Sequence, residues 1–265
     1  MHPIVDCHCH IYPEKIAARA VESIGNFYDI PMSNGGTVAD MQRSEREAGI
    51  THQIVFSVAT KTSQVASINR FIADEVARSN GTMTGLGTLH PDSEDIKGDI
   101  EHLVSLGLKG VKLHPDIQGF KIDDYRCLKI YELCEGRLPI LFHTGDSRYD
   151  FSNPNRLKPI LETYKQLTVI GAHLGGWSMW DTAVDELQGY DNFYVDCSSS
   201  LYAISPEKAT EVIRRYGVDR VLFATDYPMW SPKEELERFY KLGLDRDEQE
   251  QILYKNAVKL FRLTF

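Results

Sequence analysis

The sequence predicts an α/β protein, a closed (β/α)8 barrel of the TIM type that forms a single domain over residues 1–265. Three observations support it. Short runs rich in β-branched residues recur along the chain, amphipathic helical stretches separate them, and the length is 265 residues. Strands that alternate with helices pair in parallel through right-handed crossovers. A closed barrel of eight such units usually takes about 250 residues, so the length also fits.

The predicted strands are spread over the whole chain. They cover residues 4–10, 52–59, 83–90, 108–114, 139–145, 168–174, 192–198 and 220–226. Helices are predicted over 63–80, 123–136 and 206–217, which begin at Ser, Asp or Pro and end at Asn or Gly. An open doubly wound sheet is the alternative. It would normally carry a GxGxxG phosphate loop, which this sequence lacks.

The longest irregular stretch is DIPMSNGGT, residues 29–37. It follows the helix expected after the first strand. It is interpreted as either a mobile lid or an insertion, and the sequence leaves both open.

Composition narrows the class of protein. The net charge of −9 argues against nucleic acid as a partner and against an anionic membrane surface. No apolar run approaches the roughly 20 residues that span a bilayer, and the N-terminus has no signal-peptide pattern. The five cysteines are odd in number and lack the spacing of a disulfide framework, so a reducing cytoplasm is predicted.

The first predicted strand contains DCHCH, residues 6–10. Side chains two residues apart on a strand share a face, so we expect Asp6, His8 and His10 on one face and Cys7 and Cys9 on the other. Two histidines about 7 Å apart along the strand can reach one metal ion. The cysteines are expected to pack outward against the helices as small apolar residues.

Further candidate ligands stand at the ends of later strands. Because the carboxyl ends of all barrel strands meet at one rim, these side chains are expected to converge on a single mouth. Together with the first strand, the rim set is His8, His10, His90, His114, His143, His173 and Asp226. Imidazole and carboxylate ligands suit Zn²⁺ or a similar divalent ion, and a catalytic site keeps one position open for water.

The ordered set of motifs resembles the amidohydrolase superfamily, and within it the amidohydrolase-2 group related to aminocarboxymuconate-semialdehyde decarboxylase. The motifs are DxHxH at 6–10, ILFHTG, GAHLGG and LFATDYP. The resemblance implies one divalent metal, most often zinc, held by the ligands His8, His10, His143 and Asp226. It also implies that Asp226 accepts a proton and that His173 orients or protonates the substrate. A second metal is not expected.

The fourth predicted strand leaves alternatives open. Relatives with two metals carry a carboxylated Lys or a Glu there, and GVKLHP offers Lys112 and His114 on one face. Lys112 is expected to bind a substrate carboxylate, with carboxylation or a structural role as alternatives. His114 either faces the substrate or is capped against Asp116. The related metal-dependent deoxyribonucleases typically have a Glu on this strand, which this sequence lacks.

Residues just beyond the strand ends are candidate contacts for a small planar substrate. Arg148 suits a substrate carboxylate because a guanidinium binds carboxylates with two parallel hydrogen bonds, and pairing with Asp146 or Asp150 is its alternative. The aromatic candidates either line the pocket or pack loops onto the barrel. They are Tyr12, Phe120, Trp177, Trp180, Tyr227 and Trp230.

Three functions remain at this point. The first is a metal-dependent hydrolase that attacks a small carboxylic ester, lactone or amide with a metal-bound hydroxide, with Asp226 and His173 as catalytic residues. The second is a nonoxidative decarboxylase of an aromatic or unsaturated carboxylic acid, and the weakest is an inactive barrel that only binds a ligand. The expected partner is a small molecule that carries a carboxylate, and a homo-oligomer is allowed.

Overall fold

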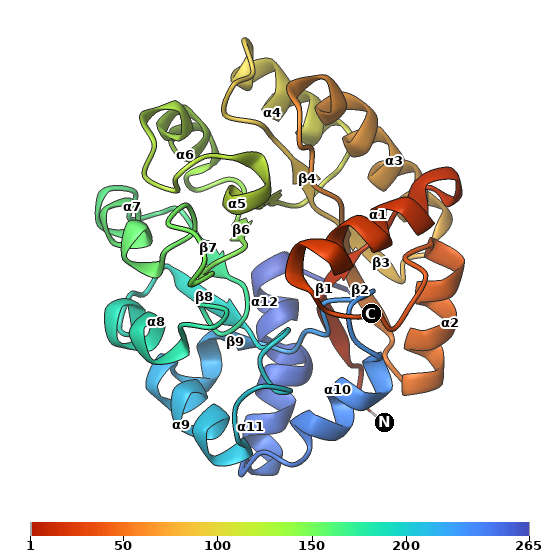
Figure 1. The fold of residues 1–265 in the computed structure, drawn as a ribbon, viewed down its shortest axis with the longest axis vertical. Helices are drawn as coiled ribbons and strands as arrows, with labels where there is room; N and C mark the ends of the chain where they lie inside the picture. The colour runs from red at the N-terminus through yellow and green to blue at the C-terminus, as the bar shows by residue number, and fades with distance from the viewer. Residues whose placement is uncertain (1, 265) are drawn as a thin grey trace.

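The computed structural model describes residues 2–264 and has parallel strands surrounded by helices (Figure 1). Two hydrogen-bonded sheets have the strand orders β1-β2-β3 and β4-β5-β6-β7-β8-β9. Only Leu86 separates β3 from β4, so these two segments follow one strand path. The strands are β1 Val5–His10, β2 His52–Phe56, β3 Met83–Gly85, β4 Gly87–Thr88, β5 Val111–Leu113, β6 Ile140–Phe142, β7 Val169–Gly171, β8 Phe193–Asp196 and β9 Val221–Leu222.

The first and last strands close the barrel. The backbone N–H of Cys7 donates to Phe223 O at 3.0 Å, and that of His10 donates to Tyr227 O at 2.7 Å. Each predicted strand contains an observed one, and 83–90 contains both β3 and β4. The predicted α/β barrel is confirmed.

Helices surround the strands as a ring (Figure 1). The predicted helices at 63–80, 123–136 and 206–217 correspond to α3, α6 and α9, and short 3₁₀ turns precede the first two. The helices are α1 Glu14–Tyr28, α2 Val38–Ala48, α3 Val65–Arg78, α4 Ile96–Ser105, α5 Pro115–Gln118, α6 Leu128–Cys134, α7 Lys158–Thr163, α8 Trp180–Leu187, α9 Pro206–Tyr216, α10 Pro232–Phe239, α11 Arg246–Glu250 and α12 Asn256–Phe261.

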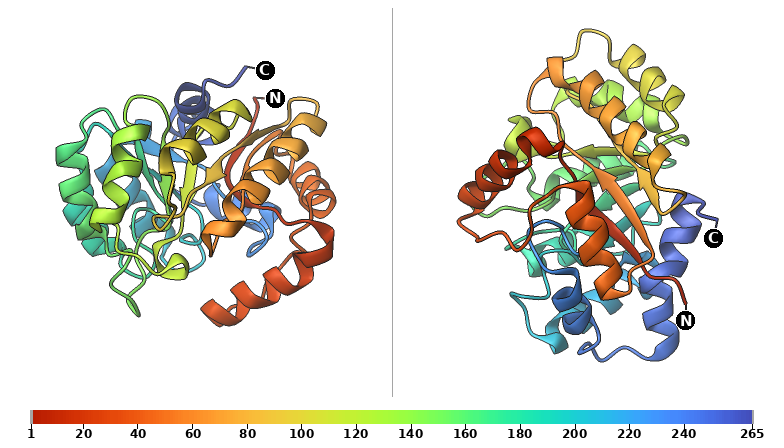
Figure 2. Two further views of the ribbon diagram at one scale, coloured as in Figure 1. Left: turned by 90° about the horizontal axis from the view of Figure 1, so that it is seen from above. Right: turned by 90° about the vertical axis from the view of Figure 1, so that its right-hand side faces the viewer.

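Helix α1 lies on the side of the molecule opposite both chain termini (Figure 2). Of its 15 residues only Ala17 is buried. The stretch 29–37 that follows is attached at its far end, because Ser33 N donates to Met229 O and Asn34 N donates to Pro228 O, both at 3.1 Å. The segment therefore rests on the loop after β9.

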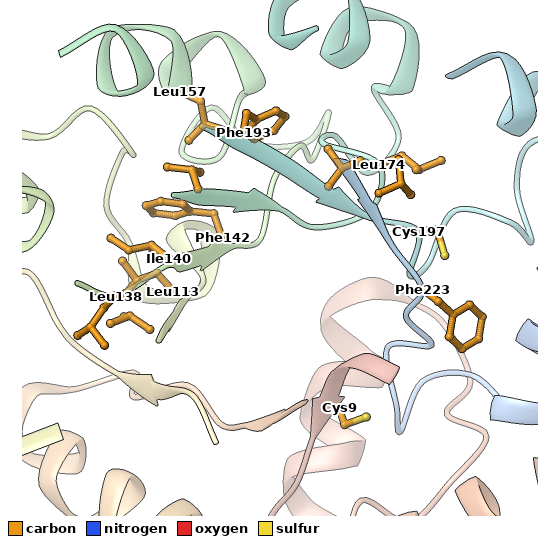
Figure 3. Close-up of a cluster of buried hydrophobic side chains, with 14 of the residues drawn as sticks. Cys9, Leu113, Leu138, Ile140, Phe142, Leu157, Leu174, Phe193, Cys197 and Phe223 are labelled. Carbon is orange, nitrogen blue, oxygen red and sulfur yellow. The ribbon is translucent and has the colours of Figure 1, made fainter. Parts of the chain in front are cut away.

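Two apolar clusters lie on the two faces of the strands. The outer cluster packs the strands against the helices, and Figure 3 shows Cys9, Phe142 and Phe193 among its members. Cys127 and Cys134 also belong to it. The second cluster fills the barrel interior with alternate residues of the same strands, such as Leu141 and Leu222.

The side-chain alternation predicted for the first strand is wrong at Asp6 and Cys7. The pairing register between β1 and β2 shifts between Asp6 and Cys9, so two residues of β1 face one of β2. Because of this bulge, Cys7 packs in the inner cluster instead of facing the helices. Asp6 lies on the outer side, close to Cys9 and to Glu45 of α2.

Candidate functional site

The carboxyl ends of the strands surround one pocket at the mouth of the barrel. Six of the seven rim residues predicted from the sequence line it. The exception within residues 2–264 is His90, which is buried and accepts a hydrogen bond from Asp92 N at 3.3 Å. The lining residues are His8, His10, Tyr12, Ile24, Tyr28, Met32, His114, His143, His173, Asp226, Pro228 and Met229.

Three candidate ligand atoms converge on one side of this pocket. His8 Nε2 lies 3.3 Å from His10 Nε2 and 3.3 Å from Asp226 Oδ1, and His10 Nε2 lies 3.8 Å from the same oxygen. Ligand atoms about 2.0–2.1 Å from a tetrahedral zinc ion are separated by about 3.3–3.4 Å. The donor types and spacing of this group, the His8 side of the mouth, therefore fit a divalent ion.

His8 is oriented by a residue that the sequence reasoning missed. Asp196, fully buried at the end of β8, accepts a hydrogen bond from His8 Nδ1 at 2.9 Å. The proton therefore sits on Nδ1, and Nε2 keeps its lone pair for the pocket. The other carboxylate oxygen of Asp196 accepts from His173 N at 3.1 Å. An Asp at the end of a predicted strand, in NFYVDCS, was the available signal.

Asp6 links the strand of His8 to the strand end of Asp226. Its Oδ1 accepts from His8 N and from Thr225 N, both at 3.0 Å, and its Oδ2 accepts from the Thr225 hydroxyl. Asp226 itself has a positive φ of 62°, and its Oδ2 accepts from the Ser199 hydroxyl. A left-handed backbone in a non-glycine residue is held by its surroundings, and here it leaves Asp226 Oδ1 facing the two histidines.

His114 and His143 form the opposite side of the mouth, the His114 side. Their rings stack with centroids 4.0 Å apart, and with Asp116 they make a second group of candidate metal ligands. His143 Nε2 lies 3.7 Å from Asp116 Oδ2. His143 thus lines the same pocket as His8 but belongs to a different group of converging atoms. Two expectations therefore stay predictions: that His143 is a ligand together with the His8 group, and that the site holds a single metal.

Hydrogen-bond partners assign the histidine protons on this side. His173 Nδ1 lies 3.1 Å from the carbonyl of Ser198, which can only accept, so this nitrogen carries the proton. His173 Nε2 therefore accepts from His143 Nδ1 at 3.0 Å. His143 Nε2 keeps a lone pair directed at the pocket. His114 Nδ1 accepts from Ile117 N at 3.4 Å, so its proton is on Nε2, 2.8 Å from the Tyr28 hydroxyl.

Burial keeps these imidazoles neutral. It lowers the pKa of His8, His10, His114 and His143 well below the usual value, and the nearby Lys112 ammonium and the neighbouring imidazoles lower it further. Burial also lowers the pKa of His173, to about 3. A neutral imidazole is the form that binds metal and accepts hydrogen bonds.

Lys112 lies beneath the pocket, fully buried in the barrel interior. Its Nζ is 3.3 Å from His8 Nε2 and 5.1 Å from the centre of the Phe56 ring. Burial lowers the pKa of its ammonium group. Lys112 is not among the lining residues within 2–264, so its predicted contact with a substrate carboxylate stays a prediction.

Arg148 pairs with Asp146, the alternative that the sequence left open. Its Nε and Nη2 donate to the Asp146 carboxylate at 2.9 and 2.8 Å, and its Nη1 donates to Phe27 O at 2.8 Å. These donors are therefore engaged within the chain, and the contact of Arg148 with a substrate carboxylate stays a prediction.

The aromatic candidates divide between the pocket and the packing around it. Tyr12 lines the pocket, whereas Phe120 is buried in the outer cluster. Tyr227 is fully buried, and its hydroxyl donates to Asp40 Oδ2 at 2.8 Å, away from the pocket. Three indole N–H groups donate to hydroxyls: Trp177 to Tyr202, Trp180 to Ser200 and Trp230 to Ser199.

The fold and the site define a TIM-barrel protein with a histidine-rich mouth that fits a divalent metal. The amidohydrolase family model matches residues 5–263, so the chain belongs to the amidohydrolase family. This confirms the resemblance stated from the motifs, and with it the class of metal-dependent enzymes. No curated protein matches the chain.

Solved structures resemble the whole chain at low sequence identity. An uncharacterized TIM-barrel protein from Bordetella bronchiseptica has a TM-score of 0.82 and 21% identity, with 99% of each chain covered. A dihydroxybenzoic acid decarboxylase from Polaromonas, with bound manganese and 2-nitroresorcinol, has a TM-score of 0.75 and 17% identity over 99% of this chain and 98% of its own. A putative 2-pyrone-4,6-dicarboxylic acid hydrolase from Pseudomonas putida has a TM-score of 0.66 and 18% identity over 100% of both chains.

No helix within residues 2–264 is long and apolar enough to cross a membrane.

Proposed function

We propose that this chain is a metal-dependent hydrolase of a small carboxylic ester, lactone or amide. The observation that carries the proposal is the convergence of three atoms on the His8 side of the mouth. His8 Nε2, His10 Nε2 and Asp226 Oδ1 lie within 3.3–3.8 Å of one another. These residues, with His143 as the fourth ligand, would hold one divalent ion. Such an ion would polarise the substrate carbonyl and lower the pKa of a water molecule.

The chain's own residues supply the proton transfers. Asp226 accepts the proton of the attacking water on its carboxylate, which Ser199 holds in place through a hydrogen bond to Oδ2. On the His114 side, His114 Nε2–H points into the pocket and donates to the oxygen that becomes negative. His173 holds the proton of His143 on Nδ1, and thereby keeps the Nε2 lone pair of His143 on the pocket side.

Decarboxylation of an aromatic or unsaturated carboxylic acid is the second candidate. It is favoured by Lys112, whose ammonium lies 3.3 Å from His8 Nε2 under the floor and attracts a carboxylate bound above it. Tyr12 and Tyr28 in the wall suit a planar ring. One structural relative is a decarboxylase and another a putative hydrolase, so these likenesses do not rank the two reactions.

The metal is proposed to be zinc, with manganese, cobalt or iron as alternatives, because site geometry and metal supply decide among them. The proposed substrate carries a carboxylate, and nucleic acid is not a proposed partner because of the net charge of −9. A cytoplasmic location suits five buried cysteines that are all free.

The test is a substrate panel offered to the protein loaded with zinc or manganese. Lactones, carboxylic esters and amides are followed by acid release, and hydroxybenzoates by CO₂ release. Acid release without CO₂ supports the first candidate, and CO₂ without acid release makes the decarboxylase the function. A chain that turns over its substrate equally well after the metal is removed would contradict both reactions.

A further inference from the structure

The pocket contains a tyrosine that comes from outside the barrel. Tyr28 is the last residue of α1, and its hydroxyl lies 2.8 Å from His114 Nε2 and 3.4 Å from His143 Nε2. With the protons assigned above, the Tyr28 oxygen accepts from His114 and its O–H donates to His143. The phenol thus occupies both polar positions of the His114 side.

The remaining space is too small for an organic substrate. The cavity has a volume of about 30 Å³, which is room for about two water molecules. Pockets that bind organic molecules usually measure about 300–1,000 Å³. A wall of the pocket must therefore move before a carboxylic acid or ester can reach His8, His10 and Asp226.

The wall that can move is formed by α1 and the start of the stretch 29–37 that follows it. Ile24, Tyr28 and Met32 line the pocket from this segment, whereas the other lining residues lie on or beside the barrel strands. α1 buries only Ala17, while α9, which packs on the barrel, buries five of its 11 residues. The apolar side chains of Val21, Ile24 and Phe27 are only half-buried, so α1 is held by less buried area than α9 is. Low burial marks elements that open readily.

One arginine fastens the end of α1 to the barrel. The Arg148 guanidinium donates to Phe27 O at 2.8 Å and lies 5.1 Å from the Phe27 ring and 5.3 Å from the Tyr28 ring. Its other donors bind Asp146, which is fully buried next to β6. Arg148 therefore connects the movable wall to the fixed barrel through one side chain.

We propose that Tyr28 is the specificity-determining residue of the pocket and acts as a displaceable gate. Its phenol holds the place of a planar oxygen acid, a carboxylate or phenol on a ring. When α1 moves outward, a substrate oxygen replaces the Tyr28 oxygen as the acceptor of the His114 Nε2–H, and the Nε2 lone pair of His143 is released from the Tyr28 hydroxyl. Arg148 is the positioning residue that keeps α1 closed. The inference rests on the proposed function only in taking this pocket as the substrate site.

Chemical modification measures the opening without turnover. Diethylpyrocarbonate, which is too large for the closed cavity, is applied to the metal-loaded full chain, and the rate at His114 is followed by peptide mass spectrometry. Arg148→Met is expected to raise this rate by about tenfold, because charge-assisted and cation–π contacts to α1 are lost. The partly exposed His102 is the internal reference and keeps its rate.

Arg156→Met is the matched control. Arg156, like Arg148, binds carboxylates, and its ion pairs are with Asp123 and Asp150 instead of with α1. Its His114 rate is expected to stay within about twofold of wild type. The gate proposal would be overturned if His114 were modified at the same rate in wild type and in Arg148→Met. It would also be overturned if Arg156→Met raised this rate as much as Arg148→Met does.

Calorimetry of benzoate binding distinguishes a gate from a fixed wall, because the two predict opposite changes in the affinity of Tyr28→Phe for benzoate. If Tyr28 competes with the ligand, Tyr28→Phe binds benzoate about 3–10-fold more tightly than wild type, because the closed state is weakened. If Tyr28 instead contacts the ligand, Tyr28→Phe binds it more weakly, which overturns the proposal. Absence of benzoate binding in both proteins would overturn the substrate class. Neither measurement depends on which reaction the site catalyses.

Discussion

The two sides of the barrel mouth are held in different ways. On the His8 side, buried carboxylates on β8 and β1 fix the candidate ligand residues, since Asp196 binds His8 and Asp6 joins His8 N to Thr225 N. On the His114 side, the partner is Tyr28 of a helix with one buried residue. Chemistry on a metal needs preorganised ligands, whereas substrate entry needs a part that opens at low cost. Under the proposed function, these two requirements lie on opposite sides of one pocket.

The largest effect is expected on the His8 side, from Asp226→Asn. The amide cannot accept a proton from water, so turnover is expected to fall by about 10²–10⁴-fold. The thermal midpoint should stay close to that of wild type, because the amide oxygen can still accept from Ser199. Steady-state rates and metal content per chain check this. Asp191→Asn, at an exposed position, is the control, and near wild-type turnover in Asp226→Asn would contradict the mechanism.

Asp196→Asn should weaken metal binding through His8, since Asp196 binds His8 but does not line the pocket. Loss of the carboxylate removes the charge that holds the proton on His8 Nδ1, so metal affinity is expected to fall by about 10–100-fold. Competition with a chelator measures the dissociation constant. A variant that binds metal as tightly as wild type would show that the His8 side is not organised by Asp196.

The carboxyl groups behind the His8 side predict a pH dependence of stability. Burial raises the pKa of Glu235 from 4.5 to about 7, against the opposing effect of its ion pair with Arg238, and nearby Asp6 adds to the shift. The pKa of Glu235 is higher in the folded chain than in the unfolded chain. The contribution of Glu235 to the free energy of unfolding is therefore fully present below pH 4.5 and is lost as pH rises through 7. As pH rises from 4.5 to 8, ionisation of Glu235 should lower the free energy of unfolding by up to roughly 3 kcal/mol.

Glu235→Gln should remove that part of the pH dependence. Urea unfolding at pH 5 and pH 8 is expected to give a smaller difference for this variant than for wild type. Glu234→Gln, an exposed neighbour on α10, should keep the wild-type difference. An unchanged difference in Glu235→Gln would mean that its carboxyl group is ionised in the folded chain at both pH values.

The smallest effect is expected at the rim of the His114 side. Trp177→Phe loses the indole N–H that donates to Tyr202 but keeps an aromatic edge beside Tyr28. The free energy of unfolding should fall by about 0.5–1.5 kcal/mol, with KM within about threefold of wild type. A rise of KM by more than tenfold would instead support the direct substrate contact predicted from the sequence.

Much of this organisation follows from local sequence patterns. Hydrophobic periodicity locates the strands of the barrel, and the position of His143, His173 and Asp226 at strand ends predicts that they meet. The motifs likewise identify the family. Each of these inferences uses residues within one element, together with the rule that all parallel strand ends share a rim.

The interactions between distant elements were decided by the tertiary structure. Asp196 and His8 are 188 positions apart, and the Tyr28 hydroxyl meets His114 across 86. The inward turn of Cys7 comes from a register shift against β2, which simple alternation along β1 does not contain. Thus local sequence patterns specify the barrel, its family and the residues at its rim. Only the packed structure decided which of them are held rigidly and which face a movable helix, because partner choice depends on register and distance in space.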